Sequence, residues 1–271
     1  MTVVVANLFS QSFLVLNMAL HLVTIPCGFD NLCYLVICDE SGLAAVVDPT
    51  EAWPVWQAVE ADGARLVAVL CTHHHRDHLD GLDDLLAEQP ELMVYGFTGD
   101  RDRIGGLNRP LTDGAIIEIG ALQATVLHSP GHTSGSLCYH IEDVVFTGDT
   151  LFGAGCGRLF EGSPDQLHNS LRRLGSLDRG TRLCFGHEYT ARNLAFGQRL
   201  EPDIVDIARR LADIAALGGG SQEQATLALE QLTNPFLRCH TRAIRENFPE
   251  LAPGCPDLEI FGRLRQLRDS F

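Results

Sequence analysis

The chain has 271 residues, with 45% hydrophobic and 20% charged side chains, which is typical of a globular protein with one large domain or two smaller ones. Its formal net charge is −15 and all its basic residues are arginine, which argues against a nucleic-acid-binding protein with a positive surface for phosphates. Nine cysteines without a Cys-x-x-Cys pair indicate buried, reduced thiols and predict a cytoplasmic protein.

The first residues are apolar, but they have neither the positive charge nor the small-residue cleavage site of a secretory signal. They are also too short to span a membrane. We interpret residues 1–17 as an N-terminal extension that is not native, and Met18 as the biological start. The run from Leu20 to Pro26 predicts the first strand.

Short elements separated by turn residues fill the chain up to residue 90. They are strands at 33–38, 44–47 and 66–71 and helices at 53–60 and 79–88. The first two strands form a predicted hairpin with its turn at Glu40-Ser41-Gly42. The third is a continuous apolar run, which is typical of a buried strand.

Four potential metal ligands lie between that buried strand and the following helix. They are His73, His75, Asp77 and His78. A regular helix or strand would scatter these side chains, so we expect a turn that directs them to one place. Imidazole and carboxylate ligands suit Zn²⁺, Mn²⁺ or Fe²⁺. The alternative is a histidine-rich solvated loop, and His74 itself is expected either to support a ligand or to face solvent.

Further hairpins and helices follow. We predict strands at 116–119, 123–127, 137–141, 144–147 and 182–185, and a helix at 164–174. This order favours mixed sheets with helices outside them. From about residue 191 the chain is helical, with predicted helices at 203–217, 225–232 and 258–267. That part holds 10 Arg and 11 acidic residues, a balance that favours an anionic ligand there.

Three further candidate ligands each follow a predicted strand and lie close to a glycine, which lets the backbone approach a cofactor. They are His132, Asp149 and His187. Taken singly, each could be a hydrogen-bonded turn residue. Because four separate strand ends carry such residues, we predict one shared metal site.

These motifs resemble the metallo-β-lactamase superfamily, and within it glyoxalase II, the hydroxyacylglutathione hydrolases. The resembling stretches are residues 45–49, 72–78, 132–135, 146–152, 156–162, 186–190 and 234–238. The resemblance covers roughly residues 18–271. It implies an α+β fold, an αββα sandwich with a C-terminal helical domain, divided into a metal-binding domain at 18–190 and a substrate-binding domain at 191–271.

The resemblance also implies a role for each candidate ligand. His73, His75 and His132 would hold one metal ion, Asp77, His78 and His187 a second, and Asp149 would bridge the two. The expected cofactor is two divalent ions per chain, Zn²⁺ first, with Fe or Mn as alternatives. Asp77 would be catalytic through the bridging hydroxide, and Asp48 is a candidate hydrogen-bond partner for a ligand imidazole.

The implied peptide-binding residues are Arg158, Tyr189, Arg265 and Arg268. Arg158 replaces the family's lysine, Phe160 its tyrosine and Arg76 its usual aromatic residue, which puts one peptide hydrogen bond and the rim of the site in question. For Arg265 and Arg268, a solvated helix face is the alternative.

The function that this resemblance implies is hydrolysis of S-(2-hydroxyacyl)glutathione, such as S-D-lactoylglutathione, by a hydroxide between two metals. The expected partner is the glutathione thioester, with no nucleic acid or membrane partner and a monomeric chain. The alternatives are a mononuclear iron persulfide dioxygenase of the same superfamily and a non-catalytic binder of glutathione conjugates.

Overall fold

The structure is a computed structural model that describes residues 20–216 and 225–271. The predictions for residues 1–17 and for Met18 lie outside the described residues, as does the end of the helix expected at 203–217. Among the described residues, no helix has the length and apolar character that a membrane crossing needs.

A six-stranded mixed sheet holds the first part of the chain, in the order β1-β2-β3-β4-β5-β6. Its strands are β1 (Leu20–Cys27), β2 (Asn31–Cys38), β3 (Leu43–Val47), β4 (Arg65–Leu70), β5 (Met93–Phe97) and β6 (Arg109–Leu111). The first three are antiparallel, as the predicted hairpin requires, and β3 to β6 run parallel.

A second sheet has the order β13-β10-β9-β8-β7. Its strands are β7 (Ile116–Ile119), β8 (Leu122–His128), β9 (Leu137–Ile141), β10 (Val144–Gly148) and β13 (Arg182–Phe185). Only β10 and β13 pair in parallel. A small hairpin of β11 (Leu151–Phe152) and β12 (Gly155–Cys156) follows β10.

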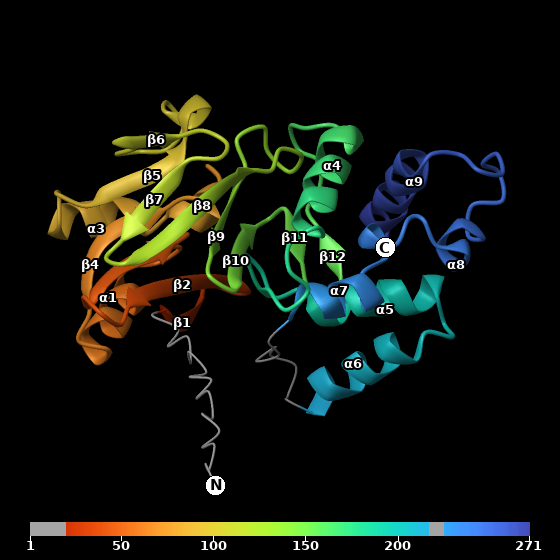
Figure 1. The fold of residues 1–271 in the computed structure, drawn as a ribbon, viewed down its shortest axis with the longest axis horizontal. Helices are drawn as coiled ribbons and strands as arrows, with labels where there is room; N and C mark the ends of the chain where they lie inside the picture. Colours follow the sequence, from red (N-terminus) through yellow and green to blue (C-terminus); the bar gives the residue numbers. More distant parts are fainter. Residues whose placement is uncertain (1–19, 217–224) are drawn as a thin grey trace, which may run out of the picture.

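The two sheets face each other across a buried apolar core that includes Val36 and Leu70 from the first sheet and Val126 and Phe146 from the second. Helices α1 (Ala52–Ala61) and α3 (Leu82–Glu88) cover the outer face of the first sheet. Helix α4 (Pro164–Leu174) covers the second, together with the C-terminal helices. This is the expected α+β sandwich of helix, sheet, sheet and helix layers (Figure 1).

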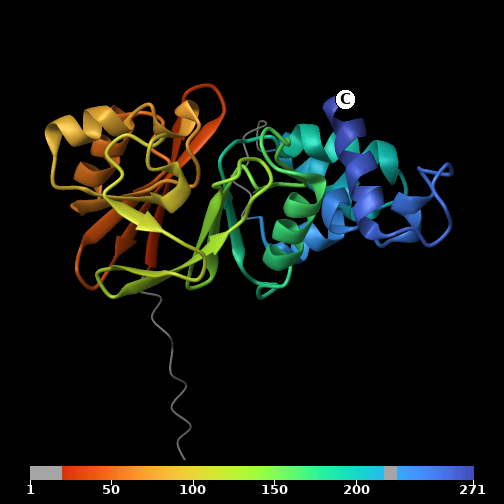
Figure 2. The same cartoon turned by 90° about the horizontal axis from the view of Figure 1, so that it is seen from above.

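The C-terminal part is helical and lies beside the second sheet, at the end of the molecule away from α1 and α3 (Figure 2). Its helices are α5 (Thr190–Leu200), α6 (Val205–Ala216), α7 (Leu227–Thr233), α8 (Arg242–Arg245) and α9 (Asp257–Asp269). Phe196, Phe236 and Phe261 join the apolar cluster between this part and the second sheet.

Two expectations differ in detail. The helix expected at 79–88 is two helices, α2 (Arg76–Leu79) and α3, because the backbone nitrogen of Gly81 donates to the carbonyl oxygen of Pro49 at 3.0 Å and not to the preceding helical turn. Strands β5 and β6 were not predicted; β6 has only three residues and contains Pro110. All nine cysteines are free and buried, as expected.

Candidate metal and substrate site

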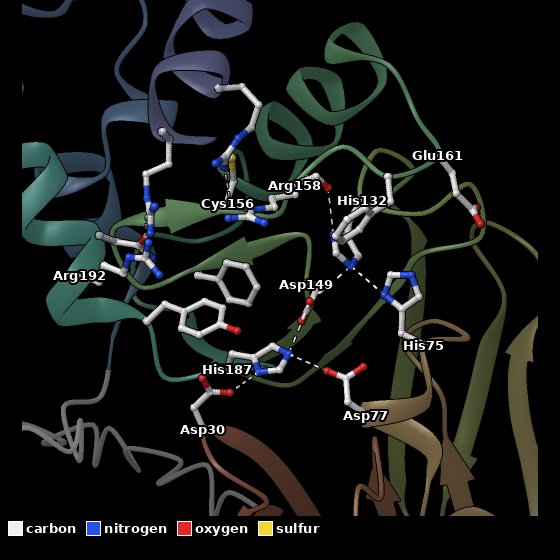
Figure 3. Close-up of a pocket in the computed structure, with 16 residues that line it drawn as sticks. Asp30, His75, Asp77, His132, Asp149, Cys156, Arg158, Glu161, His187 and Arg192 are labelled. Carbon is white, nitrogen blue, oxygen red and sulfur yellow. Dashed lines mark hydrogen bonds and ion pairs between the residues drawn. The ribbon is translucent and has the colours of Figure 1, made fainter. Parts of the chain in front are cut away.

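The seven candidate ligands meet at the end of the sandwich that borders the helical part. Figure 3 shows those of them that line the cavity, His75, Asp77, His132, Asp149 and His187. His73 and His75 follow β4, and Asp77 and His78 lie on the first turn of α2. The other three follow β8, β10 and β13. They are His132, Asp149 and His187.

Three histidine nitrogens converge in the first cluster. Nε2 of His73 and Nε2 of His132 each lie 3.1 Å from Nδ1 of His75. Two nitrogens on one tetrahedral Zn²⁺ are about 3.3 Å apart, given Zn–N distances of about 2.0–2.1 Å. The spacing of this cluster therefore fits one ion.

A second cluster forms beside it. Nε2 of His187 lies 3.2 Å from Nε2 of His78 and 3.3 Å from Oδ2 of Asp77. Asp149 lies between the clusters, with Oδ1 3.2 Å from Nε2 of His78 and Oδ2 3.3 Å from Nε2 of His132. The donor set of five imidazoles and two carboxylates suits two divalent ions. The structure thus brings together all seven side chains.

Hydrogen bonds on the far side of three imidazoles fix which nitrogen faces the centre. Nδ1 of His78 lies 2.9 Å from Oδ2 of Asp48, and Nδ1 of His187 lies 2.8 Å from Oδ1 of Asp30. Nδ1 of His132 donates to the carbonyl oxygen of Arg158 at 2.9 Å. This arrangement leaves each Nε2 free for a ligand role. The expected place of Asp48 is confirmed; Asp30 was not predicted.

Burial and neighbouring charges shift the pKa values of the side chains in the cluster in different directions. Burial, followed by the charges of the other histidines, holds the pKa of His73 well below its usual range. Burial acts in the same direction on His78, but the carboxylates of Asp149 and Asp48 more than offset it and raise its pKa well above the usual value. For Asp149, burial opposes ionisation, yet His78 and the other histidines lower its pKa to about 2.

His74 does not face solvent, so that alternative is wrong. Its side chain is 15% exposed, and its Nε2 lies 3.3 Å from Nη1 of Arg103 and 3.4 Å from Oε1 of Glu161. Arg103 also donates to Glu161 at 2.5 Å and to the buried Asp100. This charged group ties the histidine turn to the loop that carries Arg158.

A cavity of about 660 Å³ joins the ligand cluster to the helical part. All four predicted peptide-binding residues line it, and Arg265 and Arg268 are only 4% and 8% exposed, so a solvated helix face is wrong for both. Tyr189 stacks flat on His187 with ring centroids 5.0 Å apart. Tyr189 therefore connects the ligand cluster to the arginine-lined wall.

Phe160 and Arg76 differ in their relation to the cavity. Phe160 lines it and packs edge-on against His75 and His132, although it is 63% exposed. Arg76 does not line it; its side chain is 92% exposed and pairs with Asp80.

Sequence reasoning missed Arg192 and Asn193, which also line the cavity. Both lie on the first turn of α5, just beyond the resembling stretch 186–190, and Figure 3 shows Arg192 on the helical side of the cavity. One sequence signal could have identified these two residues, because they belong to a helix that begins immediately after a strand end that carries a ligand.

Comparison with known proteins agrees with this geometry. The family model for the metallo-beta-lactamase superfamily matches residues 28–187, and the model for the hydroxyacylglutathione hydrolase C-terminus matches residues 188–271. Because the superfamily match covers more than half of the chain, the chain belongs to the metallo-β-lactamase superfamily. Its sandwich fold and its clustered histidines and carboxylates agree with this.

More specific relatives cover nearly the whole chain. Hydroxyacylglutathione hydrolases from Synechococcus sp. (strain JA-3-3Ab) and Methylococcus capsulatus are each 41% identical, over 93% of this chain and 100% and 99% of their own. The crystal structure of TTHA1623 in a di-iron-bound form is 27% identical with a TM-score of 0.57, covering 79% of this chain and 100% of that one. Within the superfamily, this chain belongs to the hydroxyacylglutathione hydrolase family.

Proposed function

We propose that the protein hydrolyses S-(2-hydroxyacyl)glutathione thioesters, releasing a 2-hydroxy acid such as D-lactate and glutathione. The observation that carries this proposal is one cavity with two contrasting walls. Histidines and carboxylates line one side, and Arg158, Arg192, Arg265 and Arg268 line the other. When the thioester carbonyl of the substrate lies at the first wall, its anionic peptide part lies at the second.

Two divalent metal ions are part of this proposal. His73, His75 and His132 would hold one, and Asp77, His78 and His187 the other, with Asp149 in contact with both. Bound there, the ions would lower the pKa of water toward neutral and so supply the nucleophile for hydrolysis. The match to the metallo-beta-lactamase family model and the di-iron form of TTHA1623 support metal binding, with Zn²⁺, iron and Mn²⁺ all suited to the donor set.

The protein's own side chains would orient the reactants. Asp77 lines the cavity, and its hydrogen bond to His187 lowers its pKa, so it is an ionised acceptor that can orient the attacking water at neutral pH. Arg158, Tyr189, Arg265 and Arg268 would hold the peptide part of the substrate. The leaving group is a thiolate. It needs little help from a general acid because the pKa of a thiol lies not far above neutral pH.

The test is turnover of S-D-lactoylglutathione by the metal-loaded protein, which is measured as the loss of the thioester absorbance. We expect hydrolysis that a chelator stops and added metal restores. Asp77→Asn should lower kcat strongly while leaving the fold intact, whereas Asp80→Asn, a matched change on an exposed neighbour, should have little effect. Absence of turnover in the metal-loaded protein would contradict the proposal, and oxygen-dependent consumption of glutathione persulfide would favour the dioxygenase alternative.

A further inference from the structure

The arginine wall of the cavity holds more positive charge than the described residues neutralise. Arg158 and Arg265 share one carboxylate, with Nε of Arg158 3.7 Å and Nη2 of Arg265 2.9 Å from Oδ1 of Asp269. No carboxylate within the described ranges 20–216 and 225–271 forms an ion pair with Arg192 or Arg268. Among the described residues, two guanidinium groups of the wall thus have no carboxylate partner.

The protein holds Arg268 in place through a neutral partner. Its Nε and Nη2 donate to Oδ1 of Asn193 at 3.3 and 3.1 Å. Asn193 is anchored in turn, because its Nδ2 donates to the carbonyl oxygen of Gly153 at 2.9 Å. Since Arg192 and Asn193 are adjacent on α5, the contact that orients Arg268 also brings Arg192 to the same wall.

This arrangement has an energetic cost in the absence of an anion. Arg268 is 8% exposed, and burial, followed by the charges of Arg192, Arg265 and Arg158, lowers its pKa to about 10. A buried cation without an ionised partner is strongly unfavourable, so such a group is typical of a functional site rather than a stabilising one. Glutathione has two carboxylates, and a guanidinium fork binds a carboxylate through two parallel hydrogen bonds.

We propose that Arg192 acts with Arg268 to bind one carboxylate of the glutathionyl group and so makes the enzyme specific for an anionic peptide thioester. This inference rests on the proposed function, because the peptide is the substrate's leaving group. Arg192 lies on α5, on the helical side of the cavity and away from His75 and Asp77 (Figure 3), so we assign it a role in binding and not in the chemical step. It therefore affects KM and leaves kcat largely unchanged.

The test compares Arg192→Gln with the unaltered enzyme on S-D-lactoylglutathione and on S-lactoyl-N-acetylcysteamine, a thioester without a carboxylate. Loss of a charge-assisted hydrogen bond should raise KM about tenfold for the first substrate and leave kcat/KM for the second unchanged. Arg192→Lys should recover part of the loss. Arg209→Ala, which removes an exposed arginine from α6, is the matched charge control. An unchanged KM, or equal losses on both substrates, would overturn the proposal.

Two substrate analogues identify the carboxylate. If the penalty of Arg192→Gln disappears when the glycine carboxylate is amidated, Arg192 binds that group; if it disappears when the γ-glutamyl residue is removed, Arg192 binds the glutamyl carboxylate. A penalty that persists with both analogues contradicts carboxylate binding. Calorimetric binding of S-methylglutathione, which cannot be hydrolysed, separates this inference from the proposed function. About tenfold weaker binding by Arg192→Gln supports the inference even without turnover, and equal binding overturns it.

Discussion

Asp48 accepts a hydrogen bond from Nδ1 of His78 at 2.9 Å, although the two residues lie 30 positions apart. The same carboxylate accepts hydrogen bonds from the backbone nitrogen of Thr72 at 2.7 Å and from its hydroxyl at 2.6 Å. Asp48 follows β3 and has a positive φ of 51°. One buried carboxylate thus links the start of the histidine turn to a candidate ligand that follows it.

Replacing Asp48 by Asn should weaken metal binding about 10- to 100-fold, because the imidazole of His78 loses the anion that fixes its orientation and increases its basicity. The measurement is Zn²⁺ affinity by chelator competition. Asp39→Asn, in the exposed turn between β2 and β3, is the control. Equal affinity of the Asp48 variant and the unaltered protein would show that this contact does not support the site.

Metal binding at neutral pH should release protons. In the metal-free protein Asp149 and Asp48 raise the pKa of His78 well above its usual value, so its imidazole is protonated at pH 7 and an incoming ion must displace that proton. Because protons compete with the metal below the raised pKa, affinity should fall as pH falls. Calorimetry in buffers of different ionisation enthalpy measures the release. A binding enthalpy independent of the buffer at pH 7 would disagree with this protonation state.

Glu230 should be important for stability. Its side chain is fully buried, pairs with Arg210 at 2.7 Å and accepts hydrogen bonds from the backbone nitrogen of Ala154 at 2.7 Å and from Asn234 at 2.9 Å. Glu230→Ala removes the carboxylate that pairs with the buried Arg210 and accepts these two hydrogen bonds, so it should lower the free energy of unfolding by about 3–5 kcal/mol, measured by urea denaturation.

The control for Glu230 is Glu246→Ala, which removes one member of an exposed ion pair with Arg242 and should change stability little. Because Ala154 lies in the hairpin between Asp149 and Arg158, the Glu230 variant should also lose activity at temperatures where it is still folded. Similar unfolding free energies for the two variants would refute a structural role for the buried pair.

Gly186→Ala should impair metal binding without unfolding the protein. A Cβ at this position would lie 2.5 Å from Oδ1 of Asp149 and 2.5 Å from Cε1 of His78, so one or both ligands must move. We expect fewer than two ions per chain by elemental analysis, with a near-normal circular dichroism spectrum. Gly262→Ala, where a Cβ meets nothing within 4 Å, is the matched control. Full metal loading of the Gly186 variant would contradict this geometry.

Elements with a strong local pattern could be predicted from the sequence. Helix α4 has the predicted bounds, because Ser163 and Gln166 form a capping box and Pro164 occupies the first turn. Strand β13 also agrees, as a short apolar run before a glycine. The short edge strand β6 has no such pattern, and the break at Gly81 depends on a close contact with a distant residue that no local pattern reveals.

The candidate site follows the same rule. Each ligand stands in a recognisable local setting, so the sequence could place all seven, while their pairing into two ions came from the resemblance and stays a prediction. The contacts that join distant segments could not be found in this way. Asp30 bonds to His187 across 157 positions, and Asn193 to Arg268 across 75.

The two-metal site can be tested most directly by a crystal structure of the metal-loaded protein with anomalous diffraction recorded at the metal's absorption edge. We predict two anomalous peaks, one bound by His73, His75 and His132 and the other by Asp77, His78 and His187, with Asp149 bound to both. A single peak, or two peaks that do not share Asp149, would contradict a two-metal hydrolase.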